Sequence, residues 1–168
     1  PHTEVVVLSD YAKASVLNVA VMIAAASKQG KRILVDPKGE DFSRYAGASI
    51  LTPNKAELRH IIGSWKNEED LTARAQRLRA DLSLEALLVT RSEEGMSLYC
   101  EAGVTHFPAM AREVFDVSGA GDTVIATLAT MLGAGVSLPE AAAIANRAGG
   151  IVVGKLGTAT VTREELFP

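Results

Sequence analysis

The residues with the clearest chemical potential form one short stretch, Asp116-Val117-Ser118-Gly119-Ala120-Gly121-Asp122-Thr123. Two glycines on either side of an alanine allow the backbone to turn tightly and to come close to a ligand. A helical pattern of apolar residues follows directly, so the turn is expected to lead into a helix N-terminus. The free N–H groups and the positive dipole end found there suit a phosphate or a developing oxyanion. Asp122, in the first turn, could accept a proton from a hydroxyl group that attacks that phosphate.

The same stretch also has a purely structural interpretation, in which the glycines form a turn and Asp122 caps the helix. For these residues taken alone, that interpretation is favoured. A second stretch, Thr52-Pro53-Asn54-Lys55-Ala56-Glu57-Leu58, is explained equally well by a capping box between Asn54 and Glu57.

Short apolar runs alternate with helical patterns along most of the chain. Strands are expected at 5–8, 33–35, 50–52 and 86–89, with an antiparallel hairpin at 96–100 and 104–107. Helices are expected at about 14–29, 68–82 and 122–133, and capping boxes at 137–140 and 162–165 start two more. This alternation predicts an α/β fold with a mostly parallel sheet and right-handed crossovers.

Composition narrows the class of protein. The 168 residues amount to one domain, and a net charge of −3 without a basic block argues against nucleic acid as a partner. The longest apolar run, residues 19–26, is too short to span a membrane. The single cysteine, Cys100, cannot form an internal disulfide, which fits the cytoplasm, and it is expected to be a buried structural thiol. His106 has no second metal ligand near it in the sequence.

One apparent phosphate-binding motif is rejected. Residues 149–155 match the first seven positions of G-x-x-x-x-G-K-[ST], but Leu156 stands where Ser or Thr must bind magnesium. The glycines also follow a helical run instead of a strand. Residues 154–157 are therefore predicted to end a helix and form a loop.

Together, the two stretches resemble the signatures of the ribokinase-like (PfkB) sugar kinases. In that family the Gly-Ala-Gly amides form an anion hole and the last aspartate is the catalytic base, which here are Gly119, Ala120, Gly121 and Asp122. The resemblance implies a three-layer αβα fold, with ATP and Mg²⁺ as cofactors. It assigns Mg²⁺, held through its waters, to Asn54 and Glu57. It assigns the nucleotide to Asn54, Lys55, Ala56, Glu57, Thr90, Gly95 and Asn146.

Further segments are similar to one subgroup, the heptose 7-phosphate kinases. These segments are 8–13, 35–39, 51–54, 89–96 and 154–158. The subgroup phosphorylates the anomeric hydroxyl of D-glycero-β-D-manno-heptose 7-phosphate on the route to ADP-heptose and lipopolysaccharide. Sugar phosphate binding is assigned, on weaker grounds, to polar residues that follow two strands: Asp10, Lys13, Asp36 and Lys38.

The resemblance covers the C-terminal half of the family's kinase domain. Residues 1–168 are therefore expected to be the nucleotide-binding and catalytic-base portion of one such domain, without the family's N-terminal strands and lid. A homodimer and a fused nucleotidyltransferase are possible partners in the complete enzyme. Two other functions stay open: another sugar or nucleoside kinase of the family, and a nucleotide-binding module without activity.

Overall fold

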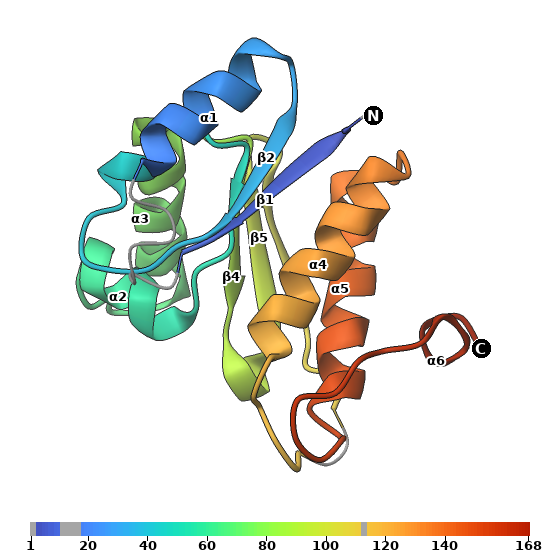
Figure 1. Ribbon diagram of the computed structural model, residues 1–168. Helices are drawn as coiled ribbons and strands as arrows, with labels where there is room; N and C mark the ends of the chain where they lie inside the picture. Colours follow the sequence, from blue (N-terminus) through green and yellow to red (C-terminus); the bar gives the residue numbers. More distant parts are fainter. Residues whose placement is uncertain (1–2, 11–17, 112–113) are drawn as a thin grey trace.

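The structure is a computed structural model that describes residues 3–10, 18–111 and 114–168. It forms three layers, with a sheet between two groups of helices (Figure 1). Helices α1 (Val19–Lys28), α2 (Lys55–Ile62) and α3 (Glu68–Asp81) cover one face, and α4 (Ala120–Gly133) and α5 (Leu138–Val152) cover the other. A last short helix, α6 (Arg163–Leu166), lies near the C-terminus, where it contacts α5 and buries Leu166. The predicted αβα architecture is confirmed.

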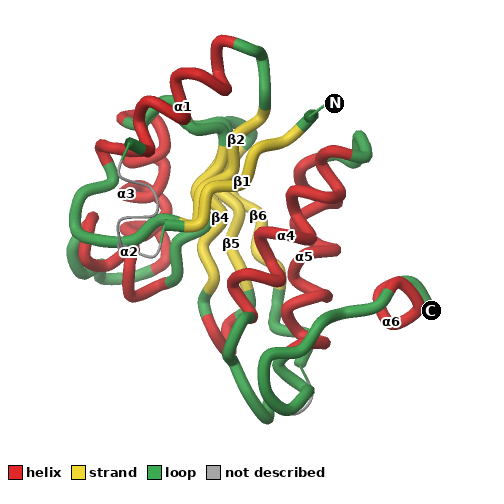
Figure 2. The backbone as a smooth tube through the Cα atoms, in the orientation of Figure 1, coloured by secondary structure: helices red, strands yellow, loops and turns green. Residues whose placement is uncertain are grey.

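The sheet has six strands in the order of the sequence: β1 (Val5–Ser9), β2 (Arg32–Asp36), β3 (Ile50–Leu51), β4 (Ala86–Thr90), β5 (Met96–Cys100) and β6 (Gly103–Phe107). Strands β1 to β4 are parallel, and β5 and β6 add an antiparallel hairpin. Figure 2 shows the strands stacked between the helical layers. Because β1 to β4 run the same way, the loops that follow them meet at one edge of the sheet.

The period-2 alternation of the central strands divides the core into two clusters. Ile33 and Val35 of β2 pack with the α1–α3 layer, whereas Leu34 between them packs with α4 and α5. The same division holds for Leu87 and Leu88 of β4. Both clusters are closed to solvent, which explains why these strands appear in the sequence as continuous apolar runs.

Small residues let α4 and α5 pack closely. Ala141, Ala142, Ala145 and Ala148 of α5 are completely buried. A Cβ added at Gly149 would lie 3.0 Å from Val124 Cγ2 of α4. The position of α4, and therefore of its N-terminus, is fixed by this contact and by its packing on the sheet.

The helix starts differ in part from the sequence prediction. The Asn54–Glu57 and Thr162–Glu165 capping boxes are both formed. The predicted box at Ser137 is wrong, because Ser137 Oγ bonds to the Glu140 carboxylate and caps no main-chain N–H. Helix α4 begins at Ala120 and not at Asp122, since Gly119 takes a left-handed conformation and serves as its N-cap.

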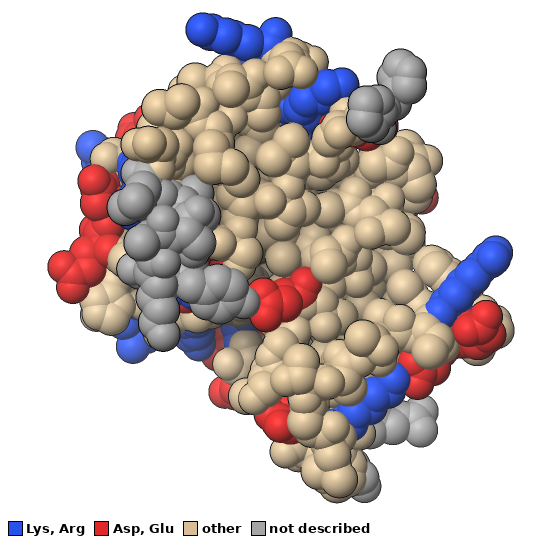
Figure 3. Space-filling view, viewed as in Figure 1, with Lys and Arg blue, Asp and Glu red and all other residues tan. Residues whose placement is uncertain are grey.

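Charged side chains lie mainly at the rim of the face shown in Figure 3, apart from an acidic group near its centre. In the part of the chain that the structure describes, every helix is too short or too polar to cross a bilayer. Cys100, expected to be buried, is half-buried.

Gly95 sits in the tightest backbone contact among the described glycines. Its φ is +88°, and a Cβ added there would lie 2.0 Å from the carbonyl oxygen of Phe107. Two 3₁₀ turns flank the sheet, η1 (Ser43–Tyr45) and η2 (Ser92–Glu94), and Gly95 ends the second of them. Only glycine fits this link between η2 and the end of β6.

We therefore expect Gly95→Ala to lower the free energy of unfolding by about 2–5 kcal/mol, from the backbone clash and the left-handed φ. Urea denaturation followed by circular dichroism measures this. Gly133→Ala is the matched control, since a Cβ there has only an ordinary 3.7 Å contact with Val5. Equal stability of Gly95→Ala and the unsubstituted chain would show that the contact does not constrain the loop.

Candidate active site

The turn before α4 is held by its own short-range hydrogen bonds. The main-chain N–H of Ser118 donates to Asp116 Oδ1 at 2.8 Å. Gly119 has a φ of +76°, and its carbonyl accepts from the N–H of Thr123 at 2.9 Å. The N–H of Ala120 turns back to the Val117 carbonyl at 3.2 Å. These bonds fix the direction in which the first turn of α4 presents its amides.

Two of these amides are available to a ligand. Within residues 3–10, 18–111 and 114–168, the main-chain N–H groups of Gly119 and Gly121 have no acceptor. A Cβ added at Gly121 would meet nothing within 4 Å, so the glycine leaves open space in front of its amide. The arrangement suits an anion at the N-terminus of α4. Ala120 can contribute only by exchanging its bond to Val117.

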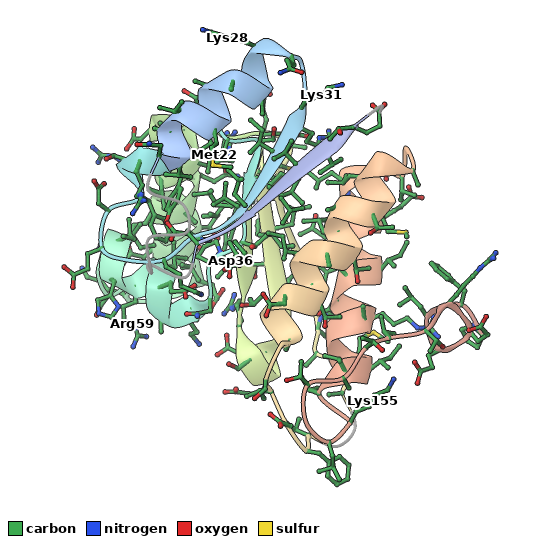
Figure 4. The ribbon with its side chains drawn as sticks, viewed as in Figure 1. Met22, Lys28, Lys31, Asp36, Arg59 and Lys155 are labelled. Carbon is green, nitrogen blue, oxygen red and sulfur yellow. The ribbon has the colours of Figure 1, made fainter. Side chains whose placement is uncertain are left out.

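Acidic side chains gather around Lys38 at the same edge of the sheet. Lys38 Nζ lies 2.5 Å from Glu57 Oε1 and 3.5 Å from Asp36 Oδ1. Asp36 is the last residue of β2, and Glu57 lies in the first turn of α2 after β3. The two carboxylates around Lys38 therefore come from the ends of two neighbouring strands. Figure 4 shows Asp36 in the middle of the molecule, near the carboxyl ends of the strands.

The electrostatics of this cluster place Asp122 on the same side of the molecule. Burial, together with the charges of Glu57 and Asp122, raises the pKa of Asp36 to about 6 against the opposing effect of Lys38. Burial lowers the pKa of Lys38, but its hydrogen bond to Glu57 and the two carboxylate charges outweigh burial and raise it. Asp122 itself is exposed in the first turn of α4. Asp36 and Glu57 therefore share the Lys38 ammonium group, and Asp122 lies close enough to act on Asp36.

Asp10, proposed from the sequence as a substrate-binding residue, is buried and bonded to other side chains. It is 3% exposed, and its carboxylate accepts a 2.8 Å hydrogen bond from the Tyr45 hydroxyl. Arg44 Nη2 lies 3.5 Å from the same carboxylate. The Tyr45 hydroxyl also accepts from the main-chain N–H of Lys38 at 3.1 Å. Asp10 thus supports the segment that carries Lys38.

A cavity of about 430 Å³ lies beside the start of α4. Its wall is mainly apolar, with residues from α4, α5, the β4–β5 loop and the segment after β6. Gly121 lines it, and so do Thr90, Gly95 and Asn146. Asn146 is 8% exposed and donates from Nδ2 to the Pro108 carbonyl at 2.8 Å.

A second hollow, of about 510 Å³, lies between the start of α1 and the segment at residues 38–44, and Lys38 lines it. Lys38 and Arg44 give it two cationic side chains, and Glu40 and Asp41 give it two acidic ones. Residues 18–21, at the start of α1, form part of its wall. The cluster of Asp36, Lys38 and Glu57 thus adjoins this hollow through Lys38 and the α4 N-terminus through Asp122.

The donor set around Asp36 suits Mg²⁺. Its oxygens are hard ligands, and three carboxylates against one lysine leave excess negative charge. Asn54 Oδ1 and Glu57 Oε2 each already accept a 2.8 Å main-chain hydrogen bond from the capping box. Among the described residues, no three His, Cys, Asp or Glu side chains form a ready-made metal cage. The residues fit an ion that keeps waters and phosphate ligands, and they do not fit a cage made of protein alone.

Most of the residues proposed from the sequence gather at this edge, in two groups. Thr90, Gly95, Asn146 and Gly121 line the cavity. Asp36, Lys38 and Glu57 form the charged cluster, whereas Asn54, Lys55 and Ala56 lie at the start of α2 and are not among the cavity-lining residues. Lys13 lies outside the described residues.

The sequence reasoning missed Arg44 and Tyr45. Their shared partner, Asp10, follows β1 and lies 34 and 35 residues before them, whereas Lys38 lies seven residues before Tyr45 in the same connection between β2 and β3. No pattern in the sequence signals such a contact. The sequence signal for charged groups at this edge of the sheet was the polar residues that follow the apolar runs of β1 and β2.

Comparison with known proteins places the whole chain in one group. The model of the pfkB family of carbohydrate kinases matches residues 3–165. D-beta-D-heptose 7-phosphate kinase of Bordetella bronchiseptica is 60% identical over 163 residues, which are 97% of this chain and 52% of that protein. Bifunctional protein HldE of Shewanella amazonensis is 58% identical over 98% of this chain and 35% of its own length. The chain therefore spans about half, or about a third, of these relatives.

Solved structures agree on the fold. Arabidopsis thaliana ribokinase complexed with ribose and ATP has a TM-score of 0.85 at 24% identity, over 98% of this chain and 55% of that one. Phosphofructokinase-2 from Escherichia coli, in complex with substrates and products, has a TM-score of 0.84 at 21% identity, over 96% of this chain and 54% of that one. At these identities the likeness shows a shared fold.

The raised pKa of Asp36 predicts an unusual pH dependence of stability. The pKa of an aspartate in an unfolded chain is 3.8, and burial raises the pKa of folded Asp36 to about 6. The folded state therefore holds the extra proton between these values, and stability falls as pH rises through this window. We expect Asp36→Asn to raise Tm at pH 8 by about 2–4 °C, the shift that ~1 kcal/mol produces in a domain of this size. Below pH 4 the difference should vanish.

Thermal unfolding at a series of pH values tests this. Asp41→Asn is the control, because hydrogen bonds from Ser43 lower the pKa of Asp41. That variant should lose stability at neutral pH and recover toward the unsubstituted chain in acid. A pH-independent effect of Asp36→Asn would contradict the assignment.

Proposed function

This chain belongs to the pfkB family of carbohydrate kinases, and from its site we propose that it carries the nucleotide and catalytic-base half of an ATP-dependent sugar kinase. The observation that supports this most directly is the position of the α4 N-terminus. Gly121 lines the apolar cavity, while the next residue, Asp122, acts electrostatically on the charged cluster around Asp36. One helix start thus adjoins a place for a nucleoside and a place for a phosphate acceptor.

The cavity has the features of a nucleoside site. Its apolar walls suit the faces of an adenine ring, and Thr90 and Asn146 offer polar groups that can fix its orientation. Asn146 donates one amide hydrogen from Nδ2 to the Pro108 carbonyl. Its Oδ1 would accept a hydrogen bond from the amino group of the base. The nucleoside end of ATP would lie here, and its phosphates would extend past Gly121 to the N-terminus of α4.

The transfer step needs little from the protein beyond positioning and charge. Asp122 would accept the proton of the sugar hydroxyl while that oxygen bonds to the γ-phosphorus. The bond from this phosphorus to the bridging oxygen of ADP would break. The N–H groups of Gly119 and Gly121, with Ala120 if it releases Val117, would donate to the phosphoryl oxygens as charge spreads over them.

Glu57, Asn54 and Asp36 would hold Mg²⁺, largely through its waters. The ion would neutralise charge on the ATP phosphates. Lys38 would then redistribute its contacts among the remaining anions, because a divalent cation competes for the same carboxylates. In the second hollow, which Glu40 and Asp41 also line, Lys38 and Arg44 would be the side chains that pair with a sugar phosphate.

The acceptor that we propose is D-glycero-β-D-manno-heptose 7-phosphate, phosphorylated at its anomeric hydroxyl in the cytoplasm. Identity of 60% to a heptose 7-phosphate kinase over 97% of the chain supports this choice. A place within a bifunctional protein is supported by the relatives named HldE. A homodimer of the complete enzyme remains a proposal from the family likeness alone. Another sugar or nucleoside is the near alternative, because the α4 start would serve any acceptor, and a substrate panel on the complete enzyme separates them.

We expect Asp122→Asn, in the longest reading frame that contains this chain, to lower kcat by about two to four orders of magnitude. The amide keeps the shape of the side chain and cannot accept the proton, so ATP binding should change little. Coupled ADP-release kinetics and calorimetry measure the two quantities. Asp81→Asn is the control, an exposed aspartate at the end of α3 that pairs with Arg77. Near-normal turnover by Asp122→Asn would remove Asp122 from the role of base.

The 168 residues alone should bind ATP with Mg²⁺ but show little or no sugar-dependent turnover, because they span 52% of the related kinase. The nucleotide cavity is formed within this chain, whereas a complete sugar site would need the remainder. Calorimetry followed by a turnover assay also tests the alternative of a binding module. Robust turnover by the isolated chain would contradict this division of the site.

A further inference from the structure

Arg91 is buried at the end of β4 and uses its whole guanidinium group. Its side chain is 7% exposed. It donates to both carboxylate oxygens of Glu68, at 2.8 and 2.6 Å, and twice to Glu94 Oε2, at 2.9 and 2.5 Å. A fifth bond, at 3.1 Å, reaches Ser97 Oγ. A fork with all five donors engaged holds its partners in one geometry.

The second oxygen of Glu94 extends this network to another loop. Glu94 Oε1 accepts from Nζ of Lys55, the first residue of α2. The ion pairs therefore run from Arg91 through Glu94 to the helix start that carries Asn54 and Glu57. Among the described residues, Lys55 forms its ion pair with Glu94 and not with Glu68, which lies at the start of α3.

The segment that Glu94 restrains lines the nucleotide cavity. Ser92, Glu93 and Gly95 are all cavity-lining residues. The loop is closed by the N–H of Arg91, which donates to the Gly95 carbonyl at 2.8 Å. Its base is tied to α2 by the N–H of Thr90, which donates to the Pro53 carbonyl at 3.0 Å. The Glu94–Lys55 pair is a second tie, four residues further along the loop.

We propose that Glu94 is a positioning residue for the nucleotide, because it locks the cavity-lining loop at residues 92–95 to the start of α2 through Lys55. In this arrangement the ion pair between Lys55 and Glu94 holds the loop against the start of α2. The loop is ordered before ATP binds, so ATP does not bear the cost of ordering it. The inference rests on the proposed function, since it takes the cavity to be the nucleotide site.

Two glutamates on one arginine provide a matched pair of variants. Glu94→Gln and Glu68→Gln each remove one carboxylate from Arg91, and both should lower Tm. Of the two, Glu94→Gln is the variant that removes the side-chain tie between the loop and Lys55. We expect it to raise the Kd for ATP with Mg²⁺ about tenfold, and Glu68→Gln to leave the Kd within about twofold. Titration calorimetry on this chain measures both.

Lys55→Met gives an independent route, because it breaks the tie and leaves every bond of Arg91 in place. Its Kd should match that of Glu94→Gln, and the double variant should be no weaker than either single one. A Kd for Glu94→Gln and Lys55→Met within twofold of the unsubstituted chain would overturn the inference, as would an equal loss in Glu68→Gln. If the unsubstituted chain fails to bind ATP, the proposed nucleotide site falls, and this inference falls with it.

Discussion

The direction in which α4 starts is the constraint on which the rest of the site depends. Gly119 takes a left-handed φ of +76°, which lets the chain turn into the helix without a side chain in the way. The body of α4 is fixed by its contacts with the sheet and with the small residues of α5. Together these features aim two main-chain N–H groups at an open space and place Asp122 beside them. If the start of α4 could tilt, the N–H groups of Gly119 and Gly121 would no longer point to the same place as Asp122.

The parallel sheet supplies the other half of the site. Strands β1 to β4 end at one edge, so the segments after β1, β2 and β3 bring Asp10, Asp36 and Glu57 into one neighbourhood. Negative charge is costly at this edge, because burial, together with the charges of Glu57 and Asp122, raises the pKa of Asp36 to about 6. Lys38 offsets part of it. A site that is short of positive charge in this way favours ligands that bring a cation with their phosphates.

Much of this was predictable from the sequence, because the informative signals are local. Apolar runs mark the strands, and the spacing of Asn54 and Glu57 marks a capping box, which the structure confirms. The start of α4 was placed two residues too late, because its N-cap is Gly119 in a left-handed conformation and not a polar residue that marks a cap in the sequence. Ser137 was misassigned because its hydroxyl prefers the Glu140 side chain to the main chain. The Arg91–Glu68 pair joins residues 23 apart and has no sequence signature. Long-range pairs of this kind appear only once the fold is known.

The most direct test of the account is an amide-resolved NMR titration of the ¹⁵N-labelled chain with a non-hydrolysable ATP analogue and Mg²⁺. The account predicts the largest shifts at the N–H groups of Gly119 and Gly121, with further shifts at Gly95 and the Asn146 side chain. Gly30, at the end of α1 and away from the cavity, should stay unchanged. Saturable binding that leaves the resonances of Gly119 and Gly121 unmoved would contradict the claim that the start of α4 receives the phosphates.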